Sequence, residues 1–170
     1  MIAAPIPDND AERVAALHAL LILDTAPEDR YDKILNFVAA EFGVPIALVS
    51  LVDSERQWFK AQFGLTVCET ARDISFCGHA ILRPDIMVVP DALLDPRFAD
   101  NPLVTDPPHI RFYAGAPLLL PNGLALGTLC LIDTAPRQLE AVDLAILATL
   151  RDLVMLEVAP QAPGAGNSDA

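Results

Sequence analysis

A thiol and an imidazole lie two residues apart in this sequence, at Cys77 and His79, with apolar residues on both sides. Cysteine and histidine are common zinc ligands, and together they can act as nucleophile and base. Zinc needs three or four ligands, however, and a cysteine and a histidine separated by one residue are not a usual zinc pair. Cysteine is also among the residue types that are most often buried. The pair therefore favours the lining of a pocket, and we expect no metal there.

The three cysteines, Cys68, Cys77 and Cys130, are an odd number in a chain whose start lacks the basic and apolar segments of a secretion signal. Disulfide frameworks belong to oxidising compartments, so we expect reduced thiols in a cytoplasmic protein. No apolar run reaches eighteen residues, so no membrane span is expected. A net charge of −12 disfavours contact with phosphate backbones and anionic lipids. We therefore expect neither nucleic acid nor a membrane as partner.

A second group of polar and aromatic residues surrounds the proline-rich segment 91–108. Aspartate and asparagine beside proline are typical of turns, while a loop of this length is usually functional or mobile. The alternative is a lid in which an arginine meets a polar or anionic ligand and aromatic rings pack on it. Both interpretations stay open for Arg111 and Tyr113. The candidate pocket residues from the two groups are Phe76, Cys77, His79, Asp91, Phe98, His109, Arg111 and Tyr113.

The spacing of apolar residues predicts the elements that must position these side chains. Helices are predicted over residues 11–23, 28–42 and 139–157, the second with Gly43 as its left-handed C-cap. Strands are predicted over residues 45–52, 57–63, 86–90, 112–120 and 124–132. The turns at 53–56 and at Asn122-Gly123 predict two hairpins, and segment 91–108 is predicted as a loop with at most one helical turn near Arg97 and Phe98.

This order of elements indicates an α+β fold, in which an antiparallel sheet carries the terminal helices on one face and irregular segments on the other. Trp58 and Phe59 are adjacent in a strand and should point to opposite faces of the sheet. Gly115 and Gly127 fit close backbone packing between strands. With 170 residues, of which 53% are hydrophobic, the chain suits one domain. We predict a flexible N-terminal arm over 1–10, the domain over 11–158 and a disordered tail over 159–170.

Seven segments within residues 11–157 together resemble the GAF domain family. They are LLILDTAPE (20–28), VPIALVSLVD (44–53), RQWFK (56–60), SFCGHAI (75–81), DPRFADNP (95–102), RFYAGAPL (111–118) and GTLCLID (127–133). The subgroup is similar to GAF modules found beside diguanylate cyclase, histidine kinase and phosphatase outputs in bacteria. The resemblance implies a profilin-like central antiparallel sheet of five or six strands, with a helical bundle on one face and a ligand pocket on the other.

The same resemblance implies a sensory or regulatory module of signal transduction that binds an unknown small molecule and is not an enzyme. No output domain follows the last predicted helix, so we expect a stand-alone bacterial protein. It would act through a homodimer of its terminal helices or through a separate output protein, either a histidine kinase or a protein of cyclic di-GMP signalling.

Two alternatives stay open. Some stand-alone GAF proteins are free methionine-(R)-sulfoxide reductases that use cysteines on the pocket loops, and Cys68 and Cys77 are spaced much as two of those cysteines are. The catalytic cysteine of those enzymes lies in the loop after the third strand, and segment 91–108 contains no cysteine. The other alternative is a structural dimerisation module with a vestigial pocket.

Overall fold

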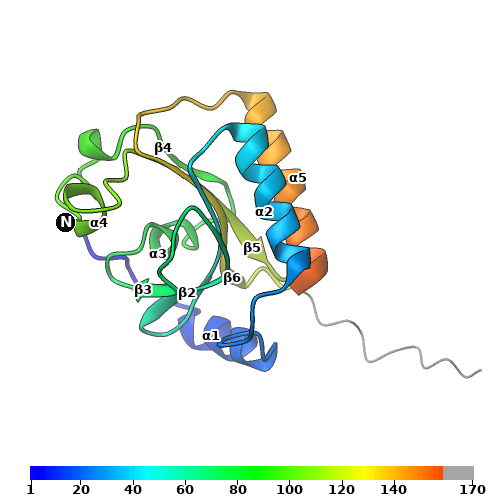
Figure 1. The fold of residues 1–170 in the computed structure, drawn as a ribbon. Helices are drawn as coiled ribbons and strands as arrows, with labels where there is room; N and C mark the ends of the chain where they lie inside the picture. The colour runs from blue at the N-terminus through cyan, green and yellow to red at the C-terminus, as the bar shows by residue number, and fades with distance from the viewer. Residues whose placement is uncertain (159–170) are drawn as a thin grey trace, which may run out of the picture.

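Six antiparallel strands form one sheet at the centre of the computed structural model, which describes residues 1–158 (Figure 1). The strands are β1 (Ile46–Val52), β2 (Arg56–Phe63), β3 (Glu69–Ala71), β4 (Met87–Val89), β5 (Phe112–Leu119) and β6 (Ala125–Asp133). Their spatial order is β3-β2-β1-β6-β5-β4. The two predicted hairpins, β1–β2 and β5–β6, therefore meet along the central β1–β6 pair. The predicted α+β fold with a GAF-like antiparallel sheet is confirmed.

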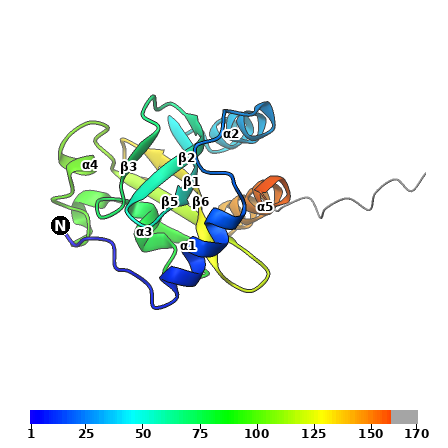
Figure 2. The same ribbon diagram turned by 90° about the horizontal axis from the view of Figure 1, so that it is seen from below.

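Two helices, α2 (Asp29–Phe42) and α5 (Ala141–Val158), lie side by side on one face of the sheet (Figure 2). Their buried side chains, among them Leu35, Val38, Leu147 and Val154, form the core on that face. The predicted end of α2 is confirmed, because Gly43 has a φ of 60° and donates its N–H to the Ala39 carbonyl. Glycine occupies this left-handed conformation without a Cβ clash.

Helix α1 (Asp10–Ala19) lies across one end of the sheet. Arg13 on this helix donates to the Val52 carbonyl at 2.6 Å and to the Ala125 carbonyl at 3.2 Å, which lie at the same end of β1 and β6. The predicted continuation of the helix to residue 23 is wrong. Leu21 and Asp24 have φ values of 54° and 60°, and residues with positive φ cannot continue a right-handed helix.

Short helices and loops cover the second face of the sheet: α3 (Phe76–Ala80), the 3-10 helix η1 (Ala92–Leu94) and α4 (Pro102–Thr105). A turn does lie near Arg97 and Phe98, where the Phe98 and Ala99 N–H groups donate to the Asp95 carbonyl. The predicted limit of one helical turn is wrong, because η1 and α4 add a turn on either side of it. Each begins where a side chain caps free backbone N–H groups, at Asp91 for η1 and at Asn101 for α4. Helix α3 and strand β3 were not predicted, since both are too short to show a period.

The N-terminal arm runs along this second face in an extended form. Ile2 donates its backbone N–H to the Arg97 carbonyl, and Ala4 donates to the Asp73 carbonyl. The arm was predicted to be flexible, and its mobility stays a prediction that hydrogen exchange at Ile2 and Ala4 can test. Residues 159–170, predicted to be a disordered tail, lie outside the described residues.

The sheet separates two apolar cores. Trp58 packs in the core beneath α2 and α5, while its neighbour Phe59 packs in the core beneath α3. Both rings are buried, so the prediction that they point to opposite faces is confirmed. Within residues 1–158 no helix is both long and apolar enough to cross a membrane.

Candidate functional site

A cavity of about 280 Å³ lies between the second face of the sheet and the segments that cover it. Strands β1, β2, β5 and β6 and helix α3 form its floor and walls, and the segments 65–70 and 103–110 form its rim. The lining residues are Leu48, Gln57, Phe59, Leu65, Val67, Thr70, Phe76, Cys77, Leu103, Pro107, Pro108, Ile110, Tyr113 and Ile132. Among the described residues, no lysine, arginine, histidine or carboxylate lines this cavity.

Cys77 lies at the start of α3, which the Ser75 hydroxyl caps by accepting the Gly78 N–H at 3.0 Å. Its sulfur accepts hydrogen bonds from Tyr113 Oη on β5 at 3.2 Å and from Thr128 Oγ1 on β6 at 3.1 Å. Both hydroxyls reach the sulfur because β5 and β6 are neighbours in the sheet. The thiol is therefore held against the sheet at the floor of the cavity.

Burial raises the pKa of the Cys77 thiol, but hydrogen bonds to its sulfur, the largest from Cys130, outweigh burial and lower the pKa to about 6. Burial and the neighbouring Cys77 sulfur raise the pKa of Cys130 well above its usual range. The two shifts are opposite in direction, so the sulfur of Cys77 holds negative charge more readily than that of Cys130. Burial also raises the pKa of Tyr113, so its hydroxyl keeps the proton that it donates to Cys77.

Gly115 makes room for this arrangement. A Cβ placed on Gly115 would lie 2.2 Å from the Tyr113 hydroxyl oxygen. The tyrosine ring can therefore pack over position 115 only because that residue is a glycine. Gly127 serves the sheet in a similar way, because a Cβ there would lie 1.8 Å from the Ser50 carbonyl oxygen of β1. The prediction that these two glycines permit close packing in the strands is confirmed.

Gln57 is the buried polar residue on the opposite wall of the cavity, with 5% of its surface exposed. Its Oε1 accepts a hydrogen bond from Ser50 Oγ at 3.1 Å, and its Nε2 donates to Thr70 Oγ1 at 2.6 Å. The three residues come from the adjacent strands β1, β2 and β3. A glutamine amide has two N–H groups and a carbonyl oxygen with two lone pairs, so hydrogen-bonding capacity remains for a further partner.

Of the eight residues predicted from the sequence to form the site, Phe76, Cys77 and Tyr113 line the cavity together. Phe98 lies directly behind them, fully buried, and stacks on Phe76 with a centroid distance of 4.0 Å. His79 turns away from the cavity, and its Nε2 lies 3.1 Å from the Ile2 carbonyl oxygen of the N-terminal arm. Burial lowers the pKa of His79.

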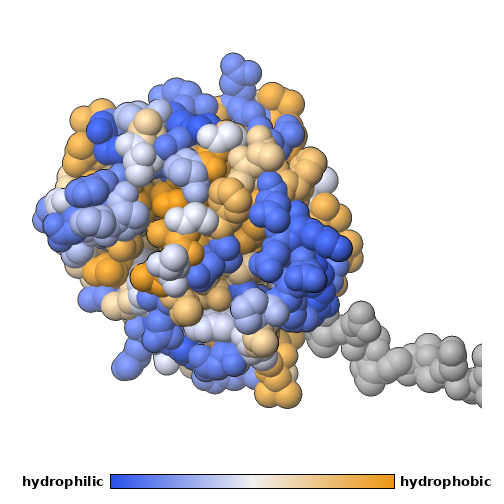
Figure 3. All heavy atoms as spheres, in the orientation of Figure 1, coloured by the Kyte–Doolittle hydropathy of each residue, from blue (hydrophilic) through white to orange (hydrophobic). Residues whose placement is uncertain are grey.

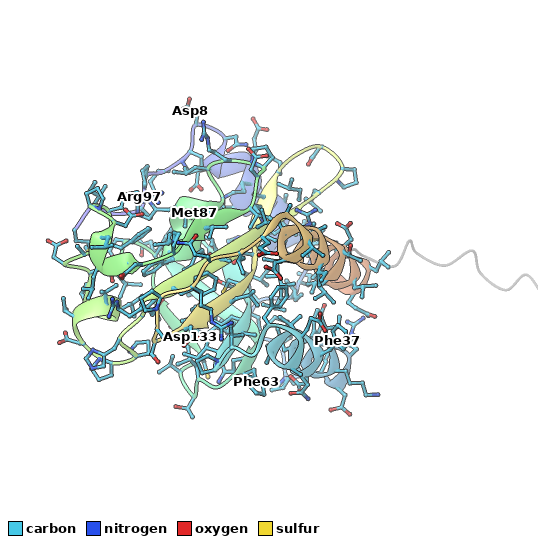
Figure 4. All side chains as sticks on the ribbon, turned by 90° about the horizontal axis from the view of Figure 1, so that it is seen from above. Asp8, Phe37, Phe63, Met87, Arg97 and Asp133 are labelled. Carbon is cyan, nitrogen blue, oxygen red and sulfur yellow. The ribbon has the colours of Figure 1, made fainter. Side chains whose placement is uncertain are left out.

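The three remaining candidates lie on the outside of the domain. Arg111 forms two hydrogen bonds of 2.8 Å with Asp91, and these bonds lower the pKa of the Asp91 carboxyl. His109 is exposed, with a φ of 56°, just after the cavity rim at Pro108. The guanidinium of Arg97 likewise faces Asp95 and Met87 beside the N-terminal arm (Figure 4). A role in ligand binding stays a prediction for all eight residues.

Sequence reasoning missed the wall formed by Leu48, Gln57 and Phe59. The signal was present in the strand alternation: if Trp58 faces the helices, both of its neighbours must face the other way. The second indication of this wall was Gln57, a polar residue on a strand face that is otherwise apolar. Among residues 1–158, no group of three or more histidines, cysteines, aspartates and glutamates is placed to hold a metal ion.

The family model for the GAF domain matches residues 26–158. The chain therefore belongs to the GAF domain family. It is 44% identical over 159 residues to a cyclic di-GMP phosphodiesterase of Pseudomonas aeruginosa. That match covers 93% of this chain and 27% of the phosphodiesterase, so the chain spans about a quarter of that relative's length.

Solved structures share the fold at low sequence identity. The GAF domain of a phosphoenolpyruvate-protein phosphotransferase from Coxiella burnetii is 16% identical, with a TM-score of 0.64 over 89% of this chain and 95% of that one. The type II free methionine-R-sulfoxide reductase from Thermoplasma acidophilum is 15% identical, with a TM-score of 0.64 over 76% of this chain and 90% of that one. At such identities the likeness concerns the fold alone.

Proposed function

We propose that this chain is a cytoplasmic regulatory domain that binds a small molecule in the cavity and controls an output, and that it is not itself an enzyme. The observation that supports this most strongly is the cavity itself, which has about 280 Å³ of space behind a rim of loops. Ligand sites in proteins are mostly apolar hollows of roughly 300–1,000 Å³ with a few placed polar groups, and the volume of this cavity lies just below that range.

The proposed output belongs to cyclic di-GMP signalling. The support is the match of nearly the whole chain to about a quarter of a relative that is named a cyclic di-GMP phosphodiesterase. A histidine kinase is the other output that we propose. In either case the domain would act through contacts of its helices, with the output or with a second copy of itself.

Strand β5 provides a route from the cavity to the helices. Tyr113 lines the cavity, while its neighbours Phe112 and Ala114 point to the other face and pack in the core beneath α2 and α5. A ligand that displaces β5 or its neighbours would therefore alter the packing of α5. Such coupling requires that the ligand bind two states of the domain with different affinity.

The test is a thermal-shift screen of small molecules, followed by hydrogen exchange of the best binder. We expect a ligand that raises the melting temperature and changes exchange in α5, and we expect Leu48→Phe, which fills the cavity from β1, to abolish both effects. Leu94→Phe is the control, since Leu94 is 82% exposed and does not line the cavity. A binder that is unaffected by Leu48→Phe, or one that leaves α5 unchanged, would contradict the proposal.

One observation favours a reductase as the second candidate: a cavity thiol whose pKa of about 6 makes it a thiolate at neutral pH. Cys68, the predicted partner of Cys77 in such chemistry, is exposed and does not line the cavity. Free methionine sulfoxide is a zwitterion, and the cavity lining offers it no arginine, lysine or carboxylate. Turnover of methionine sulfoxide with a dithiol reductant, lost in Cys77→Ser, would establish the reductase and overturn our first choice.

A further inference from the structure

We infer that the ligand of the cavity is an uncharged, mainly apolar molecule with a single hydrogen-bonding group, which binds next to Gln57. This inference rests on the proposed function and names the chemical class of the ligand. It follows from three properties of the described cavity: a lining without lysine, arginine, histidine or carboxylate side chains, the space that it encloses, and the position of its one buried amide.

The first property is charge. An anionic group that enters the cavity would lose its hydration and find no cation, because none of the eleven lysines and arginines lines the cavity. Lys60 is on the same strand as Gln57 but on the opposite face, where it binds Glu28 at 2.7 Å. Arg111 follows the rim but is bound to Asp91 through its Nε and Nη2. Phosphates and carboxylates are therefore poor ligands.

A cationic group would also bind poorly in the cavity. No carboxylate lines the cavity, and the Cys77 sulfur belongs to a residue with only 2% of its surface exposed. Its two hydroxyl donors, from Tyr113 and Thr128, already solvate that sulfur from the sheet side. An ammonium group could not replace its water shell with such partners.

The second property is size. A cavity of about 150 Å³ that is lined by aliphatic and aromatic side chains holds one benzene molecule. The volume of about 280 Å³ found here is therefore suited to a molecule about twice that size. A fused aromatic ring pair or a short branched hydrocarbon fits this description, whereas a cyclic dinucleotide is much larger and carries two phosphates.

The third property is the amide of Gln57. Its bonds to Ser50 and Thr70 fix its orientation and leave one N–H and one lone pair without a protein partner among the described contacts. The other walls of the cavity are apolar or, like the Tyr113 hydroxyl, already engaged. A ligand hydroxyl or carbonyl therefore bonds at the Gln57 amide, beside the Thr70 hydroxyl, and this fixes which end of the molecule points toward β2 and β3.

Four probes that share one ring system test the inference on the full chain: naphthalene, 1-naphthol, 1-naphthoate and 1-naphthylmethylamine. Dissociation constants are measured for each by competition with a neutral fluorescent dye bound in the cavity. We expect both neutral probes to bind and the two charged probes to bind at least tenfold more weakly. 1-Naphthol should bind roughly fivefold more tightly than naphthalene, which corresponds to one net neutral hydrogen bond.

Gln57→Met, which keeps the length of the side chain, should remove the advantage of 1-naphthol and leave naphthalene binding unchanged. The matched control is Gln62→Met, on the same strand but outside the cavity, which should retain the advantage. If Gln57→Met does not fold, Thr70→Val serves instead, because it frees the glutamine amide to swing away from the ligand and should reduce the same advantage.

Tight binding of 1-naphthoate, 1-naphthylmethylamine or cyclic di-GMP that is lost in Leu48→Phe would overturn the inference and leave the proposed function intact. An advantage of 1-naphthol that survives in Gln57→Met would overturn the placement of the hydrogen-bonding group. If none of the four probes bound and Leu48→Phe changed nothing, both the inference and the proposed function would fail.

Discussion

The three cysteines of this domain differ in chemistry because their surroundings differ. Cys68 is exposed in the loop before β3, Cys130 is buried in the central strand β6, and Cys77 lies between that strand and the cavity. The residue type alone therefore does not determine reactivity. A thiol becomes a thiolate near pH 7 where hydrogen-bond donors, a nearby cation or a helix N-terminus stabilise the negative charge on its sulfur.

The first residue prediction concerns the labelling of Cys77. In a Cys68→Ser background, methyl methanethiosulfonate should modify Cys77 through the cavity at pH 7, while Cys130 reacts only on unfolding. The folded pKa of about 6 means that the rate falls as the pH drops through 6 and is constant above about 7. Mass spectrometry of quenched samples measures the rates. A profile centred near pH 8.5, the ordinary thiol value, would contradict the assignment.

The second residue prediction concerns Asp10, which binds two buried arginines. Its carboxylate accepts from Arg72 at 2.7 and 2.9 Å and from Arg13 at 3.0 Å, and both arginines are at most 3% exposed. The hydrogen bond from Arg72 is the main reason that the pKa of Asp10 lies below its usual value. Asp10→Asn should therefore lower the free energy of unfolding at pH 7 by about 3 kcal/mol, because two buried cations lose their partner.

The pH dependence of that effect has a definite sign. Because the folded pKa is depressed, the stabilisation is complete well above the unfolded pKa of about 3.9 and is lost as the pH falls through the folded pKa. The gap between wild type and Asp10→Asn should shrink below pH about 4 in urea titrations. Asp8→Asn, at an exposed position without an ion pair to a described residue, should show no such gap.

At the scale of the elements, the central β1–β6 pair depends on a glycine. Gly127 lies opposite Leu51 in the ladder, and the Ser50 carbonyl occupies the space that a Cβ at position 127 would need. Backbone cannot move aside as a side chain can. The close approach of the two hairpins therefore depends on the absence of a side chain at Gly127.

Gly127→Ala should lower the free energy of unfolding by at least about 2 kcal/mol, in the range found for overpacked cores. Chemical denaturation with detection by Trp58 fluorescence measures the loss. Gly123→Asn is the control, because nothing lies within 4 Å of its Cβ and asparagine tolerates the φ of 86° found there. If Gly127→Ala lowered the free energy of unfolding no more than Gly123→Asn does, β1 and β6 could accommodate a Cβ and the close approach would not depend on Gly127.

At the scale of the whole molecule, the helical layer keeps apolar side chains at the surface. Val142, Leu153 and Leu156 on α5 are 59%, 45% and 74% exposed, and Phe37 on α2 is 57% exposed (Figure 4). In Figure 3 apolar side chains reach the surface along the right-hand edge, where Figure 1 places α5. A contiguous apolar patch on a domain surface is typical of a site of protein contact.

We expect this surface to form the proposed homodimer. Leu156→Glu should shift the protein from dimer to monomer in sedimentation velocity and native mass spectrometry, because a carboxylate would be buried without a partner. The melting temperature of the monomer should change little, since Leu156 does not belong to the core. Leu94→Glu, equally exposed on the other side of the sheet, should leave the dimer unchanged; equal effects of the two variants would rule out α5 as the contact.

Local patterns in the sequence correctly predicted the features that depend only on residues close to one another in the chain. The strand alternation separated Trp58 from Phe59, Asn122-Gly123 marked the β5–β6 hairpin, and Gly43 ended α2. Each of these depends on backbone geometry within a few residues. The resemblance of seven segments to GAF domains supplied the arrangement of the sheet and of the helical layer, whereas α3 and β3 were not predicted.

The resemblance implied a pocket and the sequence named three of its lining residues, Phe76, Cys77 and Tyr113, but the tertiary structure decided the rest of its lining and its chemistry. Cys77 receives its hydrogen bonds from Tyr113 and Thr128, 36 and 51 residues away, through the register of β5 and β6. Arg111 was a plausible ligand residue until the fold brought Asp91 to it from 20 residues away. Hydrogen bonds and burial depend on separations in space, and no local pattern in a chain records which distant side chains will meet.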